Sequence, residues 1–506
     1  MTDEKIVSAL VNGAAYPCAL GANLGDFLAG LGFGDYPCGG HGKCGKCRVT
    51  AAGALSEPSE REKRFLSEED LGMGTRLACC VTVRGDFSVS VEKKGGAAQI
   101  KTDGALPSCP LAPIFHSYGA AVDIGTTTLA ARLYDRAGTL LASDSRLNPQ
   151  ARFGADVISR MEAALASHGG ELASLVRDAI DGMLSGMAAC AGIDPSEIDA
   201  AVITGNTVML SFLTETDTEP LTHAPFHANR LFGEFVTAGE VGLCSLGENA
   251  AVYLPPCAGA FVGADIMTAL TASGICESGK TAVLVDIGTN GEMVLAKDGM
   301  IRATSTAAGP AFEGAGISCG MGGKEGAVDR VWTEDGELCC HVIGDGDPAG
   351  VCGSGLVDAV ACLLETEQLD ETGYLEDDPA AVIRGDVSLT QNDIRAVQLA
   401  KSAIHAGMRT LLKESGVSPD EVEELDVAGG FGSYLDIKNA VAIGLLPEEL
   451  GDKVNVLGNA ALGGASMILL SGGLRAACEE RTKRISLVNL ASNPVFTSEY
   501  MERMMF

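Results

Sequence analysis

The chain has few aromatic side chains and few histidines. Aromatic residues make up 5% of its 506 positions, with a single tryptophan, and there are only seven histidines. No histidines have the spacing of a metal-binding pair except His223 and His227, which lie either side of Pro225 and which we interpret as loop residues. The sequence therefore gives no support to a histidine-based metal site.

The sequence also lacks an apolar run long enough to cross a membrane, because Pro, Asp or Gly interrupts the stretches 250–270 and 460–473. Its first residues do not have the basic and apolar regions of a signal peptide. Positive charge is scarce as well: 36 Lys and Arg face 67 Asp and Glu, for a net charge of −31. We expect a cytoplasmic protein with neither a membrane nor a nucleic acid as partner.

Cysteine is present, but not in the density of a disulfide scaffold. Seventeen cysteines in 506 residues are an odd number, and most are scattered through apolar surroundings. This pattern is typical of reduced thiols in a cytosolic and anaerobic setting.

One segment gathers cysteines closely. Cys38, Cys44 and Cys47 lie within ten residues, and glycine fills four of the seven positions between them. Thiolate sulfur is a soft ligand for iron–sulfur clusters or zinc, and the glycines allow a tight loop around such a group. Cys79, 32 residues after Cys47, can supply a fourth ligand. Three ligands on one loop with a distant fourth is the arrangement of 2Fe–2S ferredoxins, so we predict such a cluster here.

Two alternatives stay open at this point. A structural zinc site usually has two separated Cys-x-x-Cys pairs, whereas only Cys44 and Cys47 form such a pair here. Cys80 adjoins Cys79 and could replace it as the ligand, although Leu-Ala-Cys matches the ferredoxin pattern better at Cys79.

The elements expected around these cysteines fit a β-grasp ferredoxin over residues 1–95. An Asn-Gly turn at 12–13 predicts a hairpin, and apolar residues at helical spacing follow. We expect strands at 6–11, 14–18, 48–50, 81–83 and 87–91, and helices at 24–31 and 58–71. A linker stiffened by prolines is expected at 96–117.

The remainder contains an internal repeat. The sequence Val-Asp-Ile-Gly-Thr occurs at 122–126 and again 163 positions later, at 285–289, each time between two apolar segments. Downstream, strands entering glycine turns are expected at 201–206 and 426–432. Segments rich in small residues follow at 259–265 and 458–465, which lets two helices cross closely. We predict two similar half-domains, 118–282 and 283–480, followed by a tail at 481–506.

This pattern resembles the ASKHA superfamily of actin, Hsp70 and sugar kinases. The resemblance implies that the two hairpins are phosphate loops, that the Ala-Gly-Gly-Phe-Gly turn meets adenosine, and that ATP binds with Mg²⁺. The implied nucleotide-binding residues are Gly125, Thr126, Thr127, Gly288, Thr289, Asn290, Gly429 and Gly430. Asp123 and Asp286 would hold Mg²⁺ or its waters, and Asn206 would orient the attacking water.

Two further segments could line the cleft between the halves. One is 307–315, with the sequence Ala-Ala-Gly-Pro-Ala-Phe-Glu-Gly-Ala, and the other is 352–356. We expect Gly353 and Ser354 in the second segment to lie near the ribose, although either segment could equally be a helix entry.

The overall prediction is a multidomain α+β and α/β protein with a β-grasp ferredoxin followed by duplicated actin-like ATPase halves. That combination, with the phrases Gly-Pro-Ala-Phe-Glu-Gly-Ala and Cys-Gly-Ser-Gly-Leu-Val-Asp, resembles the reductive activators of corrinoid-dependent enzymes. The resemblance implies ATP-dependent reduction of a Co(II) corrinoid protein to Co(I) within a methyltransferase system. It also implies a low-potential electron donor, and a homodimer is one possible assembly.

Two other functions remain compatible with the residues. A ferredoxin-fused small-molecule kinase would transfer phosphate to a metabolite in the same cleft. A redox-sensing ATPase regulator would use the cluster to change nucleotide affinity without delivering electrons.

Overall fold

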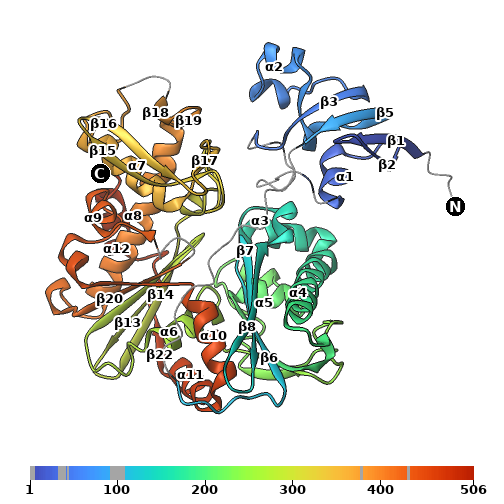
Figure 1. Ribbon diagram of the computed structural model, residues 1–506. Helices are drawn as coiled ribbons and strands as arrows, with labels where there is room; N and C mark the ends of the chain where they lie inside the picture. The colour runs from blue at the N-terminus through green and yellow to red at the C-terminus, as the bar shows by residue number, and fades with distance from the viewer. Residues whose placement is uncertain are drawn as a thin grey trace. The chain divides into compact units, whose positions relative to one another are not determined.

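The computed structural model describes residues 6–31, 33, 42, 45–91, 109–376, 380–429 and 434–506. The chain divides into two compact units, with the main boundary near residue 97 (Figure 1). Three predicted site residues, Cys38, Cys44 and Gly430, lie outside the described residues.

The first unit contains a mixed sheet with short helices. Its elements are β1 (Ile6–Val11), β2 (Ala14–Ala19), α1 (Leu24–Gly30), β3 (Arg48–Leu55), α2 (Glu68–Gly72), β4 (Thr75–Leu77) and β5 (Val83–Ser90). In the described part of this unit the five strands have the order β2-β1-β5-β3-β4, with β1 parallel to β5. Asn12 and Gly13 both have positive φ, as the predicted two-residue hairpin turn requires.

Two expectations for this unit are wrong in detail. The segment 58–71 is not one helix, because only a 3₁₀ turn at Glu62–Arg64 and the five-residue α2 form there. The 3₁₀ turn contains the fully buried side chain of Glu62, and the side chain of Ser67 caps the N-terminus of α2. A separate helix therefore begins after Ser67. The strands expected at 81–83 and 87–91 are a single strand, β5, because it pairs with β3 along most of its length.

The second unit begins with a six-stranded sheet. Its elements are β6 (Tyr118–Ile124), β7 (Thr128–Asp135), β8 (Leu140–Leu147), α3 (Val157–Ala163), α4 (Gly169–Ala191), β9 (Ile198–Gly205), α5 (Thr207–Leu213), β10 (Glu234–Thr237), β11 (Ala251–Leu254) and α6 (Ala264–Ser273). Over the described residues the strand order is β10-β11-β9-β6-β7-β8.

A second six-stranded sheet repeats this plan. Its elements are β12 (Ala282–Ile287), β13 (Asn290–Lys297), β14 (Met300–Ala307), β20 (Glu424–Ala428), α9 (Ile437–Ala442), β21 (Val454–Gly458), α10 (Ala460–Leu470), α11 (Gly472–Arg484), β22 (Ile485–Leu487) and α12 (Pro494–Glu502). The described strands have the order β21-β20-β12-β13-β14-β22. In each sheet an antiparallel meander is joined by a parallel strand, β9 beside β6 and β20 beside β12, which confirms the predicted duplication.

Smaller elements lie between β14 and β20 in the sequence, and their side chains share one apolar core with the second sheet. They are β15 (Ala327–Glu334), β16 (Glu337–Val342), β17 (Gly350–Val351), α7 (Gly353–Glu365), β18 (Ala380–Arg384), β19 (Val387–Thr390) and α8 (Gln391–Glu414). Helices α7 and α8 contribute many side chains to the apolar core of this half. Among the described residues, we find no helix with the length and hydropathy needed to span a bilayer.

The two halves meet where α6 packs against α10 (Figure 1). These helices cross closely, as expected, but α6 begins only at Ala264, so most of the segment 259–265 precedes it. Their backbones approach so tightly at Gly464 that an added Cβ atom would lie 1.7 Å from the carbonyl oxygen of Thr268. At the adjacent Gly463, by contrast, an added Cβ atom would lie 3.7 Å from the Cβ of Ala272, an ordinary contact. Only glycine therefore fits at position 464 in this packing.

We predict that Gly464→Ala lowers the free energy of unfolding of the second unit by about 3 kcal/mol or more, because the new methyl group meets backbone that cannot move independently. Gly463→Ala is the matched control and is expected to be neutral or stabilising by up to about 1 kcal/mol, since alanine favours helix. Urea unfolding followed by the fluorescence of Trp332, on β15, measures both. Equal effects of the two substitutions would contradict the close crossing.

Candidate functional site

The tips of the two repeated hairpins come together in the second unit. Gly125, Thr126 and Thr127 form the turn between β6 and β7, and Gly288 and Thr289 form the turn between β12 and β13. Asn290 is the first residue of β13.

Glu313 bridges the two tips. Its Oε2 atom accepts a hydrogen bond of 2.9 Å from the Thr127 hydroxyl and another from the Thr289 hydroxyl. This residue belongs to the segment 307–315, which was expected to line the cleft, and the structure places its carboxylate between the two hairpins. One carboxylate therefore connects threonines that are 162 positions apart in the sequence.

Four more carboxylates surround this point and act on one another electrostatically: Asp123, Asp265, Asp286 and Glu292. Asp123 and Asp286 lie on β6 and β12, Glu292 on β13 and Asp265 in the first turn of α6. The Nδ2 atom of Asn459, at the start of α10, donates a hydrogen bond of 3.1 Å to Asp123. The acidic group therefore draws residues from both halves.

Burial and mutual repulsion raise the pKa of these carboxyl groups. Burial is the largest cause for each of them. The pKa of Asp286 rises to about 8 because the charges of Asp265, Asp123 and Glu313 add to burial. That of Asp123 rises to about 7, where Asp265 adds to burial and the hydrogen bond from Asn459 opposes both. The pKa of Asp265 rises to about 6.

Glu292 and Glu313 follow the same direction. Burial and then the charge of Asp265 raise the pKa of Glu292 well above its usual value. Burial also raises the pKa of Glu313, while its two threonine hydrogen bonds and the charge of Arg160 oppose the rise. Among the described residues whose charges shift these five pKa values, Arg160 is the only cation. The site therefore has a deficit of positive charge that a cation bound there would reduce.

These carboxylates do not form a ready-made metal cage. Within the described ranges, no three or more His, Cys, Asp or Glu side chains are arranged to hold a metal ion. A divalent cation here would need further oxygen ligands, such as phosphate or water.

The other predicted residues of this region have different surroundings. Asn206 caps α5, where its Oδ1 atom accepts from the Met209 amide at 2.9 Å and its Nδ2 atom donates to the Thr126 hydroxyl at 3.2 Å. Its amide therefore contacts the first hairpin, and a role in orienting water stays a prediction. Gly429 follows β20, and an added Cβ atom there would lie 2.2 Å from the Ile287 carbonyl oxygen. Glycine at 429 thus lets the strand end approach the second hairpin.

Gly353 and Ser354 are less closely tied to the hairpins. They form the first turn of α7, and the Ser354 hydroxyl donates a hydrogen bond of 2.9 Å to the Asp329 carbonyl oxygen on β15. The hydroxyl oxygen of Ser354 also lies 3.4 Å from the sulfur of Cys352. A ribose contact for these two residues therefore stays a prediction.

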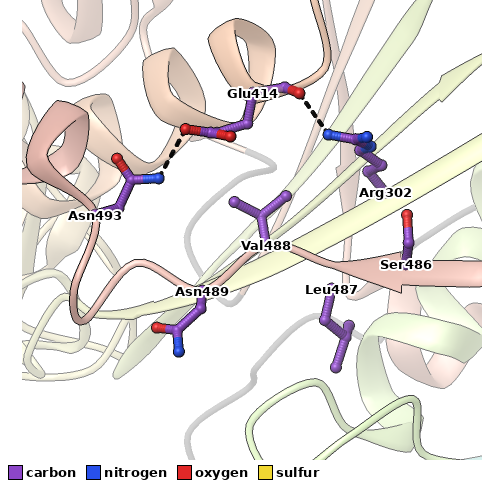
Figure 2. A pocket seen from close by; sticks show the side chains of 7 residues that line it. All are labelled: Arg302, Glu414, Ser486, Leu487, Val488, Asn489 and Asn493. Atoms are coloured by element: carbon purple, nitrogen blue, oxygen red, sulfur yellow. Dashed lines mark hydrogen bonds between the residues drawn. The ribbon is translucent and has the colours of Figure 1, made fainter.

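A separate cavity of about 280 Å³ lies on the second half, at the edge strand β22 (Figure 2). It is lined by Arg302, Glu414, Ser486, Leu487, Val488, Asn489 and Asn493. Arg302 donates to the backbone carbonyl oxygen of Glu414, and Asn493 donates to its carboxylate (Figure 2). None of the predicted site residues lines this cavity.

In the first unit, two of the four predicted cluster ligands are described, and they lie together. The sulfur atoms of Cys47, just before β3, and Cys79, just after β4, are 3.1 Å apart. Two thiols converging from separate segments fit a shared metal or cluster. Cys80 lies next to them, with its sulfur 3.8 Å from that of Cys79. Burial and then the neighbouring Cys79 raise the pKa of Cys80 to about 12, which favours a neutral thiol there.

A buried ion pair positions the segment that carries Cys79. Glu62 is fully buried and accepts hydrogen bonds from Arg76 Nε at 2.8 Å and from the Leu77 amide at 3.2 Å. Burial alone would raise the pKa of Glu62, but the bonds from Arg76, Ser59 and Leu77 outweigh it and lower that pKa. The backbone two residues before Cys79 is thereby held in place.

Several residues of the site could not be recognised from their own motifs. Asp265 and Asn459 lie in the segments noted only for their small residues, and Glu292 lies on β13, just beyond the second hairpin turn. For Asp265 and Asn459 the signal is a polar residue at the start of the corresponding helix in each repeat. Glu292 gives no such signal, because Leu129 occupies the equivalent position in the first repeat.

Comparison with known proteins adds independent evidence. Residues 280–506 match a family model described as the C-terminal domain of RACo, the ASKHA domain, and residues 118–278 match the RACo middle region. The chain is 35% identical over 421 residues to the corrinoid activation enzyme RamQ of Eubacterium limosum, covering 77% of this chain and 70% of that protein.

Two further relatives are also named for an action on corrinoid proteins. The [Co(II) methylated amine-specific corrinoid protein] reductase of Methanosarcina barkeri is 25% identical over 418 residues, which is 76% of each chain. The solved structure of a reductive activator for a corrinoid, iron–sulfur protein superposes with a TM-score of 0.75 at 27% identity, covering 99% of this chain and 98% of that one.

We predict that Asp286→Asn stabilises the free protein increasingly as the pH rises. The folded state holds protons on these carboxyl groups that the unfolded chain releases above about pH 4, so the free energy of unfolding falls between about pH 4 and the raised pKa values. Removing the charge of Asp286, whose pKa is about 8, should gain on the order of 2 kcal/mol at pH 8 and nothing at pH 4.

Thermal unfolding at several pH values, followed by Trp332 fluorescence, measures this gain. The control is Asp426→Asn on β20, because the pKa of that carboxyl rises only to about 6 and its gain should stop growing near that pH. A pH-independent effect of Asp286→Asn would contradict the repulsion between the carboxylates.

Proposed function

The chain belongs to the RACo family of reductive activators, and from this we propose that it uses ATP to drive the reduction of a Co(II) corrinoid protein to Co(I). The observation that carries the proposal is the meeting of two duplicated hairpins at one acidic cluster, in a chain that also brings two cysteines of a ferredoxin-like motif together. The partner is a corrinoid protein, as the names of the relatives state for their own substrates.

We assign nucleotide binding to the hairpin tips. Backbone N–H groups and threonine hydroxyls at Gly125–Thr127 and at Gly288–Asn290 can surround the phosphates of ATP. Gly429 and Gly430 would meet the adenosine, and Gly353 and Ser354 the ribose.

Asp123 and Asp286 would hold Mg²⁺ or its waters, and the cation would supply the positive charge that the carboxylates lack. Asn206 would orient the attacking water. Hydrolysis removes the γ-phosphate and its charge, which changes how strongly the two halves are held together.

We assign a 2Fe–2S cluster to Cys38, Cys44, Cys47 and Cys79. When bound, the cluster supplies the single electron that Co(II) requires. Clusters of the plant-type ferredoxins have potentials of about −400 mV. Reduction of Co(II) to Co(I) requires a lower potential, so electron transfer from the cluster to cobalt is uphill. Its equilibrium constant falls tenfold for each ~59 mV of difference. The chain's contribution is to bind the corrinoid partner differently in its nucleotide states, which can offset this cost. A low-potential donor in the cytoplasm would reload the cluster, and a homodimer is compatible with this scheme.

We predict that a mixture of the reduced protein, ATP and its corrinoid partner forms Co(I), and that omission of ATP greatly reduces the yield. Cobalt absorption spectroscopy under anaerobic conditions measures it. Cys79→Ser should abolish both the visible bands of the cluster and Co(I) formation, whereas Cys80→Ser is the matched control and should retain both. Equal Co(I) yields with and without ATP would exclude the coupling.

We predict that Asp123→Asn lowers the turnover of ATP by about 100-fold or more, because a cation held near the phosphates loses a charged partner. Asp426→Asn, which also removes a buried carboxylate from a central strand, should keep near-normal turnover. Phosphate release measures both variants. Phosphate transferred to a metabolite, instead of released, would favour the kinase alternative.

A further inference from the structure

Two fully buried polar side chains support the first hairpin without belonging to either repeated motif. Asn148 follows β8 and is 1% exposed, and Arg160 lies on α3 and is 0% exposed. Burying an amide or a guanidinium is costly unless its donors are satisfied, so each such residue calls for a structural or functional reason. Packing of the apolar core does not account for the burial of either polar side chain.

Their donors converge on consecutive carbonyl groups of the hairpin turn. The Nδ2 atom of Asn148 donates to the Gly125 carbonyl oxygen at 2.9 Å, and the Nη2 atom of Arg160 donates to the Thr126 carbonyl oxygen at 2.7 Å. The backbone amide of Asn148 donates to the Thr127 carbonyl oxygen at 2.8 Å. Three successive carbonyls of the turn are therefore held by two residues.

The two side chains also share a support. Asn148 Nδ2 lies 3.7 Å and Arg160 Nη1 lies 3.6 Å from the sulfur of Met209, on α5. This thioether packs behind both donors. Asn148, Arg160 and Met209 all come from the first half, whereas Glu313, which accepts from the Thr127 hydroxyl, comes from the second half.

In each peptide unit, the orientation of the carbonyl group fixes the orientation of the N–H group of the next residue. In a planar trans peptide, the carbonyl of one residue and the N–H of the next point to opposite sides. Holding the carbonyls of Gly125 and Thr126 therefore turns the N–H groups of Thr126 and Thr127 away from Asn148 and Arg160. Over the part of the chain that the structure describes, these two N–H groups have no acceptor. Successive N–H groups directed to one side form an anion-binding nest.

The charge of Arg160 acts in the same sense. Burial lowers its pKa to about 10, with the carboxylates of Asp156 and Glu313 opposing the fall, so the guanidinium stays charged at neutral pH. A fixed cation behind the turn adds positive potential at the position where the nest faces.

We infer that Asn148 and Arg160 are positioning residues for the triphosphate of ATP: they fix the orientation of the Thr126 and Thr127 amides that receive the phosphate oxygens. The inference rests on the proposed function, since it assumes that a nucleotide binds at the hairpins. It assigns the phosphate-binding geometry of the first hairpin to two residues that lie 21 and 33 positions after Thr127 in the chain.

The test uses the full chain with Arg160→Met and Asn148→Leu, which remove the donors and keep most of the volume. Affinity for Mg-ATP and for adenosine is measured by calorimetry, and KM and kcat by phosphate release. We expect Arg160→Met to lose about 10-fold to 100-fold in ATP affinity, the range for a charge-assisted hydrogen bond, with a matching rise in KM. Asn148→Leu, which removes a hydrogen bond between neutral groups, should lose about 2-fold to 10-fold. Adenosine affinity should not change, because adenosine has no phosphate to meet the nest.

Arg177→Met is the matched control. Arg177 donates to the Leu213 carbonyl oxygen through Nε at 3.1 Å and Nη2 at 2.8 Å, so it holds a backbone carbonyl in the same way but at the end of α5. It should leave both affinities unchanged. Unchanged ATP affinity in Arg160→Met and Asn148→Leu would overturn the inference, and so would an equal loss for ATP and adenosine.

Two conservative variants keep the test decisive if a variant does not fold. Arg160→Lys retains the charge but replaces the five fixed N–H donors of a guanidinium by the three of an ammonium, and should lose less ATP affinity than Arg160→Met. Asn148→Asp keeps the shape but turns an acceptor toward the Gly125 carbonyl, and should lose at least as much ATP affinity as Asn148→Leu. The reverse order in either pair would overturn the inference. If the unchanged protein binds adenosine but not ATP, or neither, the proposed function itself fails.

Discussion

The close approach of α6 and α10 is the constraint on which the ATPase-like unit depends. At Gly464 the two backbones are separated by less than a side chain would need, and this contact joins the two halves. Asp265 lies in the first turn of one of these helices, and Asn459 caps the other, where its amide donates a hydrogen bond to Asp123. The crossing that joins the halves therefore also brings their acidic residues together.

The carboxylates of the resulting site repel one another, and a cation bound there would reduce this repulsion. Burial raises the pKa of all five carboxyl groups, and the charges of neighbouring carboxylates raise those of Asp123, Asp286 and Glu292 further. Among the charged residues of the described chain that shift these pKa values, only Arg160 acts in the opposite direction. Such an arrangement is costly in the free protein, and proteins keep costs of this kind where a ligand offsets them. A nucleotide bound with a divalent cation would supply the missing charge and would link the two hairpins through the same point that Glu313 bridges. The free energy of nucleotide binding would then favour one angle between the two halves.

The two units contribute different chemistry to the reaction of this family. The first gathers thiols, with Glu62 and Arg76 holding the strand that ends beside Cys79. The second gathers carboxylates and backbone amides, with Asn148 and Arg160 holding the turn. In both, a fully buried polar contact immobilises a short segment that would otherwise be a flexible turn, which is the preorganisation that binding and electron transfer require.

The sequence by itself determined the hairpins, their duplication, the ferredoxin motif and the family, because each is recognised from short motifs that can be read without knowing which segments meet in the fold. A two-residue turn or a Cys-x-x-Cys spacing has its physical cause within a few positions. The sequence did not show that Glu313 would bridge both hairpins, that Asp265 and Glu292 would join Asp123 and Asp286, or that Asn148 and Arg160 would hold the turn. Only the tertiary structure decided these, because burial and hydrogen bonding between segments far apart in sequence depend on how the two sheets are packed, and no local pattern encodes that packing.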